Sequence, residues 1–103
     1  MSILILNETD PNRFNCVKYA RARRLDLPFG LWNIFDKIRI INSCKPEPGA
    51  VAVMSDGMPW GHLGIVQYIK SEIIVITEAN FKFGKITQRA GRQKELKILG
   101  YFV

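Results

Sequence analysis

The distribution of apolar and polar positions divides the chain into a helical first part and a second part made of strands. Apolar residues recur at helical spacing across Phe14–Leu25, and Lys18, Arg21 and Arg24 lie three apart on the opposite face. A second amphipathic helix is predicted over Phe29–Ile41, after a proline that ends the first. The chain up to about residue 42 is therefore predicted to be helical.

The second predicted helix has a well-marked division of its side chains. Its expected apolar face contains Leu31, Trp32, Ile34, Phe35, Ile38 and Ile41. The residues expected to face solvent are Asp36, Lys37 and Arg39. We therefore expect this helix to bury one stripe against the sheet that follows.

Short apolar runs follow the turn Pro46–Gly49. Strands are predicted at Ala50–Met54, Leu63–Ile69, Ile73–Thr77, Lys85–Thr87 and Lys97–Phe102. The tight connection at 70–72 predicts a hairpin between the second and third of these strands. Helices followed by strands favour an α+β fold with a mostly antiparallel sheet.

Length and composition favour one globular domain. The chain has 103 residues, 48% of them hydrophobic and 23% charged, which suffices for a single core. No apolar run approaches the roughly 18–20 residues that span a bilayer, so membrane insertion is not expected. The apolar patch Met1–Leu6 has no basic region before it, so no signal peptide is predicted.

The charge and cysteine counts narrow the classes of partner and site. A net charge of +6 and a pI near 9.6 predict attraction to a polyanion: nucleic acid, an anionic membrane surface or a cell-wall polymer. Cys16 and Cys44 could form one disulfide, but two cysteines are too few for a disulfide framework. Neither has zinc-ligand spacing, and a single histidine excludes a His-rich site, so no metal or cofactor is predicted.

Cys16 is the first candidate catalytic residue. It stands where the first helix begins, and the free N–H groups and dipole of a helix start favour a thiolate. Arg13 and Lys18 act in the same direction. A cysteine nucleophile also needs a base and an oxyanion donor, and the Cys16 backbone N–H could serve as that donor.

His62 opens an apolar strand directly after Gly61, whose small size leaves room beside the imidazole. Glu78 and Asn80 end the next strand and share one face by strand alternation. A hairpin centred on Ser71 places Asn80 opposite His62 and Glu78 diagonally from it. Either Glu78 or Asn80, or both, could therefore orient a His62 base.

These features together resemble the CHAP domain family, the cysteine, histidine-dependent amidohydrolases and peptidases of the wider papain-like group. The resemblance covers nearly the whole chain. It rests on Asn15–Ala20, Pro28–Asn33, Pro46–Val53, Gly61–Val66, Thr77–Phe81 and Ile98–Phe102. The Gly-His strand and the Glu-x-Asn ending are its specific parts, and Ala50 stands where an acidic residue is frequent.

The resemblance implies one papain-like α+β catalytic domain over residues 1–103, with N-terminal helices packed on the sheet. It implies that Cys16 is the nucleophile and His62 the general base and acid, oriented by Glu78 or Asn80. Asn15 stands where many members have a glutamine that helps form the oxyanion hole, so Asn15 is a candidate oxyanion donor.

Some family members bind calcium just upstream of the nucleophile. The carboxylates and amides available there are an incomplete match, so no bound calcium is expected here. They are Asn7, Glu8, Asp10 and Asn12.

The function implied by the resemblance is peptidoglycan hydrolysis through a thioester acyl-enzyme. The scissile bond would be either the N-acetylmuramoyl–L-alanine amide or an amide within the stem peptide or cross-bridge. Trp60 and Gly61 are expected to contact substrate. Trp32 or Phe81 could also line the substrate groove, but the core is the preferred interpretation for both. Cys44 has no base in the family pattern and is interpreted as incidental.

The expected partners are bacterial peptidoglycan and anionic wall polymers, with Lys18, Arg21 and Arg24 as one candidate contact. A monomer is expected. Without a signal peptide, the protein would be made in the cytoplasm. It would reach the wall through holin-type release or virion delivery, as phage endolysins do, or act in the periplasm.

Two alternatives belong to other functional classes. The first is a non-catalytic CHAP-like module that binds the cell wall or a protein. The second is a small nucleic-acid-binding protein, using a second basic stretch. That stretch consists of Arg89, Arg92, Lys94 and Lys97. No nucleic-acid motif supports the second alternative, and no nucleic-acid partner is expected.

Overall fold

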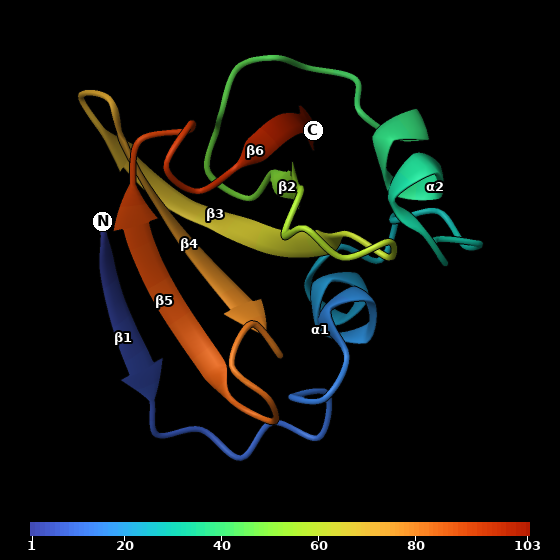
Figure 1. The fold of residues 1–103 in the computed structure, drawn as a ribbon, viewed down its shortest axis with the longest axis horizontal. Helices are drawn as coiled ribbons and strands as arrows, with labels where there is room; N and C mark the ends of the chain where they lie inside the picture. Colours follow the sequence, from blue (N-terminus) through green and yellow to red (C-terminus); the bar gives the residue numbers. More distant parts are fainter.

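A six-stranded antiparallel sheet and two short helices make up the fold in the computed structural model, which describes all residues 1–103 (Figure 1). The elements are β1 (Ser2–Leu6), α1 (Cys16–Arg23), α2 (Ile34–Arg39), β2 (Val51–Met54), β3 (His62–Lys70), β4 (Ile73–Ala79), β5 (Ile86–Gly91) and β6 (Ile98–Phe102). The strands are ordered β1-β5-β4-β3-β2-β6, so the two chain ends lie on opposite edges of the sheet. The expected α+β class with an antiparallel sheet is confirmed.

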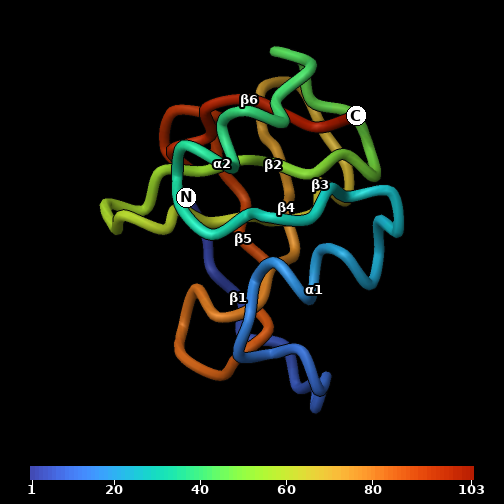
Figure 2. Tube along the Cα trace, turned by 90° about the vertical axis from the view of Figure 1, so that its right-hand side faces the viewer, coloured from blue at the N-terminus to red at the C-terminus, as the bar shows by residue number.

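The first predicted helix is present with tighter bounds. Asn15 caps α1, and its side-chain oxygen accepts hydrogen bonds from the N–H groups of Val17 and Lys18, both at 3.0 Å. The helix buries Tyr19 and Ala20 and contacts β3 and β4. Figure 2 shows α1 and α2 in front of the strands. The sheet therefore supports α1 directly, which places the first helical residue, Cys16, near the start of β3.

The second predicted helix is much shorter than expected. It begins at residue 34 because Gly30 has a φ of +80° and Asn33 forms a capping box with Asp36. The expected faces were also partly wrong. Trp32 and Phe35 are largely exposed, and Lys37 is buried rather than facing solvent. The capped start fixes a rotation of the helix that its apolar spacing does not reveal.

The N-terminal strand β1 was not predicted. Ser2–Leu6 pairs with β5 at one edge of the sheet, and Ile3, Leu4 and Ile5 all remain more than 40% exposed. An edge strand that is apolar on both faces lacks the alternation that marks a half-buried strand. The prediction that the chain is helical up to residue 42 is wrong for this segment.

The predicted hairpin is confirmed. Ile65 pairs with Thr77 and Val66 with Ile76, which is the predicted register near the site. A bulge between Val66 and Tyr68, which was not predicted, shifts the pairs nearer the turn by one residue, so Lys70 pairs with Ile73. Ser71 itself has a φ of 56° in the tight turn. The other predicted strands are present with shifted ends, and β5 extends four residues beyond the predicted Lys85–Thr87.

Successive residues of the central strands point to opposite faces and divide the core in two. Val51 and Val53 pack with Leu63 in the cluster that contains the buried residues of α1. Ala52 and Met54 belong to a second cluster on the other side. No helix in the structure has the length and apolar character needed to cross a membrane.

Candidate active site

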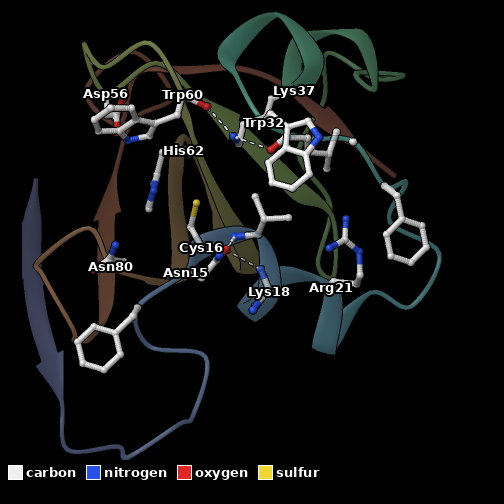
Figure 3. A pocket seen from close by; sticks show the side chains of 16 residues that line it. Asn15, Cys16, Lys18, Arg21, Trp32, Lys37, Asp56, Trp60, His62 and Asn80 are labelled. Atoms are coloured by element: carbon white, nitrogen blue, oxygen red, sulfur yellow. Dashed lines mark hydrogen bonds between the residues drawn. The ribbon is translucent and has the colours of Figure 1, made fainter.

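Cys16 opens α1 at the wall of a pocket of about 360 Å³ (Figure 3). The side-chain oxygen of Asn15 is used by the second and third N–H groups of the helix, whereas the Cys16 N–H has no acceptor in the chain. The thiol is half-buried and unpaired, and Cys44 is also a free thiol but is exposed. Cys16 therefore combines a free sulfur, a free N–H donor and the positive end of a helix.

His62 is the first residue of β3, and its ring is buried. Its Nε2 lies 2.8 Å from Oε1 of Glu78, which is fully buried on β4. This contact leaves Nδ1 as the ring nitrogen available to Cys16, and Figure 3 shows the two side chains facing each other. The structure thus brings together the cysteine, histidine and glutamate predicted from sequence.

Glu78 is itself held by two further buried side chains. Arg89 donates to both of its carboxylate oxygens, from Nε and Nη2, each at 2.7 Å. The hydroxyl of Thr87 donates to Oε2 at 2.9 Å. A bidentate guanidinium contact fixes the plane and the charge of a carboxylate. Glu78 therefore presents one oriented, ionised oxygen to His62.

Arg89 belongs to the second basic stretch of the sequence, which the nucleic-acid alternative would use, but the structure removes it from the surface. Its side chain is buried, and its guanidinium stacks 3.6 Å from the centre of the Phe81 ring. Phe81, expected in the core, is half-buried and packs 6.1 Å from the His62 ring, centre to centre. Extending the predicted strand by two residues would have placed Arg89 on the same face as Thr87.

The electrostatics of Cys16 and His62 are linked. Burial raises the pKa of the Cys16 thiol, but hydrogen bonding and charge attraction from His62 outweigh burial and bring the pKa below its ordinary value. Burial lowers the pKa of His62, while Cys16 and Glu78 together raise that pKa to about 9. Both shifts favour a thiolate–imidazolium pair at neutral pH.

Lys37 is a second residue that sequence reasoning missed. It is 2% exposed, and its ammonium donates to the backbone oxygens of Leu31, at 3.2 Å, and Trp60. Its positive charge contributes to the lowered pKa of Cys16. Burial lowers the pKa of Lys37 itself, with an opposing contribution from Cys16. Nothing in the sequence marks this lysine, because its burial depends on the capped rotation of α2.

The pocket includes some predicted site residues and some unexpected ones. Trp60 and Gly61 line it as expected from the sequence, and Trp60 is half-exposed. Trp32, which was expected in the core, is 83% exposed and also lines the pocket. The prediction for Trp32 was wrong because this residue precedes the short α2 instead of lying within a longer helix.

Asn80 lines the pocket but does not hydrogen-bond to His62. It has a φ of 66°, and its side-chain oxygen accepts a hydrogen bond from the N–H of Gly84 at 2.9 Å. In this structure the carboxylate of Glu78 contacts the imidazole, whereas Asn80 shapes the following loop at the pocket edge.

The predicted wall-contact stripe on α1 is only partly present. Lys18 and Arg21 line the pocket. Arg24 lies outside the helix, where it pairs with Asp26 at 2.9 Å and donates to the Gly49 carbonyl. Arg24 therefore links two segments of the chain and does not belong to the stripe. No group of three or more His, Cys, Asp or Glu side chains forms a cluster suited to a metal ion.

Gly61 is required by its backbone conformation and by its packing against Ile34 of α2. Its φ is +71°, and a Cβ there would lie 2.6 Å from Cδ1 of Ile34. Gly57 in the same loop has a φ of +84° but has open space around it. We expect Gly61→Ala to lower the free energy of unfolding by roughly 1–3 kcal/mol.

Gly57→Ala is the matched control for Gly61→Ala, because it adds the backbone strain without the contact with Ile34. Urea unfolding of both variants measures the difference. If both variants lose the same free energy of unfolding, the contact with Ile34 of α2 is not the reason that position 61 needs a glycine.

A CHAP domain family model matches residues 7–80. The chain belongs to the CHAP domain family. The matched range includes Cys16, His62, Glu78 and Asn80, and it ends before Arg89. A comparison with curated proteins found no match.

Two solved structures are similar to this CHAP domain. The first is the crystal structure of Ly7917 with the hydrolysing product of MDP, at 19% identity and a TM-score of 0.47. The second is the crystal structure of Ly7917, at 18% identity and a TM-score of 0.49. Each comparison covers 59% of this chain and 29% of the other, so this chain matches under a third of the length of Ly7917.

Proposed function

We propose that this CHAP domain is a peptidoglycan hydrolase in which Cys16 is the nucleophile and His62 the general acid and base. The observation that carries the proposal is a buried chain of contacts that runs from Arg89 through Glu78 to His62. His62, at the end of this chain, lies beside the free thiol of Cys16 in the pocket. A protein that only bound the wall would not need an imidazole whose carboxylate partner is fixed in this way. The net charge of +6 suits an anionic wall.

The proposed reaction begins with the ionised pair. The Cys16 thiolate attacks the carbonyl carbon of the scissile amide, and the carbonyl electrons move onto oxygen. The imidazolium of His62 then donates its proton to the leaving amine as the C–N bond breaks, which leaves a thioester. Neutral His62 next takes a proton from water, whose oxygen attacks the thioester. The acid is released and the thiolate–imidazolium pair is restored.

The oxyanion formed in each step needs hydrogen-bond donors. The Cys16 N–H is unpaired and stands at the positive end of α1. The Asn15 side-chain oxygen is occupied as the helix cap, but its NH₂ group is a donor that the cap does not use. We propose these two groups as the oxyanion hole.

Digestion of purified peptidoglycans of several chemotypes, with mass spectrometry of the released ends, tests the function. New free L-alanine amino termini would identify an amidase, and new termini within the stem or bridge an endopeptidase. The control is the Cys16→Ala protein, which should release neither. Products that are equal in both proteins, or absent with every wall, would contradict the hydrolase proposal and favour the binding module.

The rate should depend on pH as a bell-shaped curve. As pH falls, protonation of the Cys16 thiolate removes the nucleophile, and the lowered pKa of Cys16 keeps activity at pH values where an ordinary thiol is neutral. As pH rises through about 9, His62 loses the proton that the leaving amine requires. The measurement is kcat/KM from pH 5 to 10. A rate that keeps rising through pH 9 would contradict the raised pKa of His62.

A further inference from the structure

The pocket beside Cys16 has a charge pattern that amide hydrolysis alone does not require. Lys18, Arg21 and Lys37 line it, and Asp56 is its one carboxylate. Figure 3 shows the three cations on one side of Cys16 and Asp56 on the other. The pocket is therefore polarised, with a cationic side and an acidic side.

None of the three pocket cations pairs with a carboxylate. Elsewhere in the chain, five arginines form such ion pairs: Arg23, Arg24, Arg39, Arg89 and Arg92. No paired carboxylate therefore offsets the attraction of Lys18 or Arg21 for a bound anion, whereas part of the charge of Lys37 acts on Cys16.

Arg21 is fixed in place by neutral groups. Its Nη2 donates to the Pro28 carbonyl at 2.7 Å, and its guanidinium lies 4.5 Å from the centre of the Phe29 ring. A guanidinium has five N–H donors, so several remain for a ligand. Because carbonyl and ring contacts leave the positive charge uncompensated, Arg21 is a pre-ordered cation at the pocket wall.

Lys37 is held in the same manner. Its ammonium donates to the carbonyls of Leu31 and Trp60, and one of its three donors is left over. It is 2% exposed, so its charge is poorly solvated and a bound anion would restore part of the lost solvation. Trp32, beside it, offers an exposed ring to the same ligand.

The proposed reaction fixes which part of the substrate meets these cations. The leaving amine must lie next to His62, because that residue protonates it. Figure 3 shows Lys18 and Arg21 on the side of Cys16 away from His62. The acyl part of the substrate would therefore extend from Cys16 toward the cationic side. We propose that Lys18, Arg21 and Lys37 form a subsite for a carboxylate carried by the acyl part of the substrate. This proposal rests on the proposed function for its orientation.

In a stem peptide cut on the carboxyl side of its D-glutamyl residue, the matching group is the free α-carboxylate of that γ-linked residue. The acyl part of the N-acetylmuramoyl–L-alanine amide carries no free carboxylate, so the subsite implies an endopeptidase. Amidation of that carboxylate to D-isoglutamine removes the charge while conserving the shape. The subsite would therefore make the protein select stem peptides with an unamidated D-glutamyl residue over amidated ones.

Binding to an inactive protein tests the subsite separately from hydrolysis. The Cys16→Ala protein is titrated at low salt, with NMR detection, with two stem peptides that differ only in that carboxylate or carboxamide; their C-termini are amidated. We expect at least about five-fold tighter binding of the carboxylate peptide, because its contacts are charge-assisted. Arg21→Gln or Lys18→Gln should each reduce this preference, and Lys70→Gln, an exposed lysine outside the pocket, should not.

Equal affinity for the two peptides would overturn the subsite, as would no detectable binding of the carboxylate peptide or a preference that survives both pocket variants. Lys37→Met is informative only if it folds, so the conclusion rests on Arg21 and Lys18. Because no turnover is involved, these outcomes are distinct from failure of the hydrolase proposal, which the wall digestion reports.

Discussion

The Cys16→Ala protein is expected to keep its fold and to lose hydrolytic activity by about 10⁴-fold or more. The substitution removes the only atom placed to attack a carbonyl beside His62. The thiol is half-buried at the start of a helix that Asn15 caps through its own side chain, so the cap is not disturbed. The measurement is kcat/KM on peptidoglycan alongside the unfolding midpoint in urea.

Two further variants make this expectation specific. Cys16→Ser should also be inactive, because a hydroxyl beside His62 does not ionise as the thiol does. Cys44→Ala removes the exposed free thiol and should retain full activity. An active Cys16→Ala protein, or an inactive Cys44→Ala protein, would contradict the assignment of the nucleophile.

The Arg89→Met protein is expected to lose about 3–5 kcal/mol of folding free energy at neutral pH. The change removes two 2.7 Å contacts and leaves the fully buried Glu78 carboxylate with less charge compensation. Arg92→Met is the matched control, because Arg92 pairs at 2.9 Å with Glu72 where both side chains are exposed. That exposed pair is expected to contribute at most about 1 kcal/mol.

The destabilisation by Arg89→Met should depend on pH with a definite sign. Burial raises the pKa of Glu78, but His62 and Arg89 outweigh burial and lower it in the folded protein. Its ionised contacts therefore stabilise the fold above the pKa of the unfolded chain, about 4.3. That stability is lost as pH falls through the folded pKa, so the difference between wild type and variant should shrink in acid.

Urea unfolding at pH 7 and at pH values from 4 down to about 3 measures this difference, because the folded pKa of Glu78 lies below that of the unfolded chain. Arg89→Lys keeps the charge without the bidentate geometry and should lose less, which provides a folded variant if Arg89→Met does not fold. Adding Glu78→Gln to Arg89→Met removes the buried charge and should recover part of the stability. A loss no larger than that of Arg92→Met would contradict a structural role for the buried pair.

The parts of the site that could be predicted from sequence depend on local signals. The helix start at Cys16 follows from its turn and spacing, and the proximity of His62 to Glu78 follows from the short connection between two successive strands. The bulge between Val66 and Tyr68 shifts the hairpin register by one residue, yet Glu78 still reaches His62 because its side chain is long.

The missed parts depend on tertiary context. Arg89 meets Glu78 only because β5 pairs with β4, with Thr87 directly opposite Glu78. Lys37 is buried because the capping box at Asn33 sets the rotation of a six-residue helix. A charged residue whose partner comes from another strand or loop has the same local sequence pattern as one that faces solvent.

The most direct test of the ionised Cys16–His62 pair is the pH dependence of alkylation by iodoacetamide, followed for each cysteine by mass spectrometry. We expect half-buried Cys16 to react faster than exposed Cys44 at pH 6, and His62→Gln to abolish this advantage. If both thiols instead become reactive together near the ordinary pKa of cysteine, with Cys44 faster throughout, Cys16 is not an activated nucleophile and the proposed mechanism is wrong.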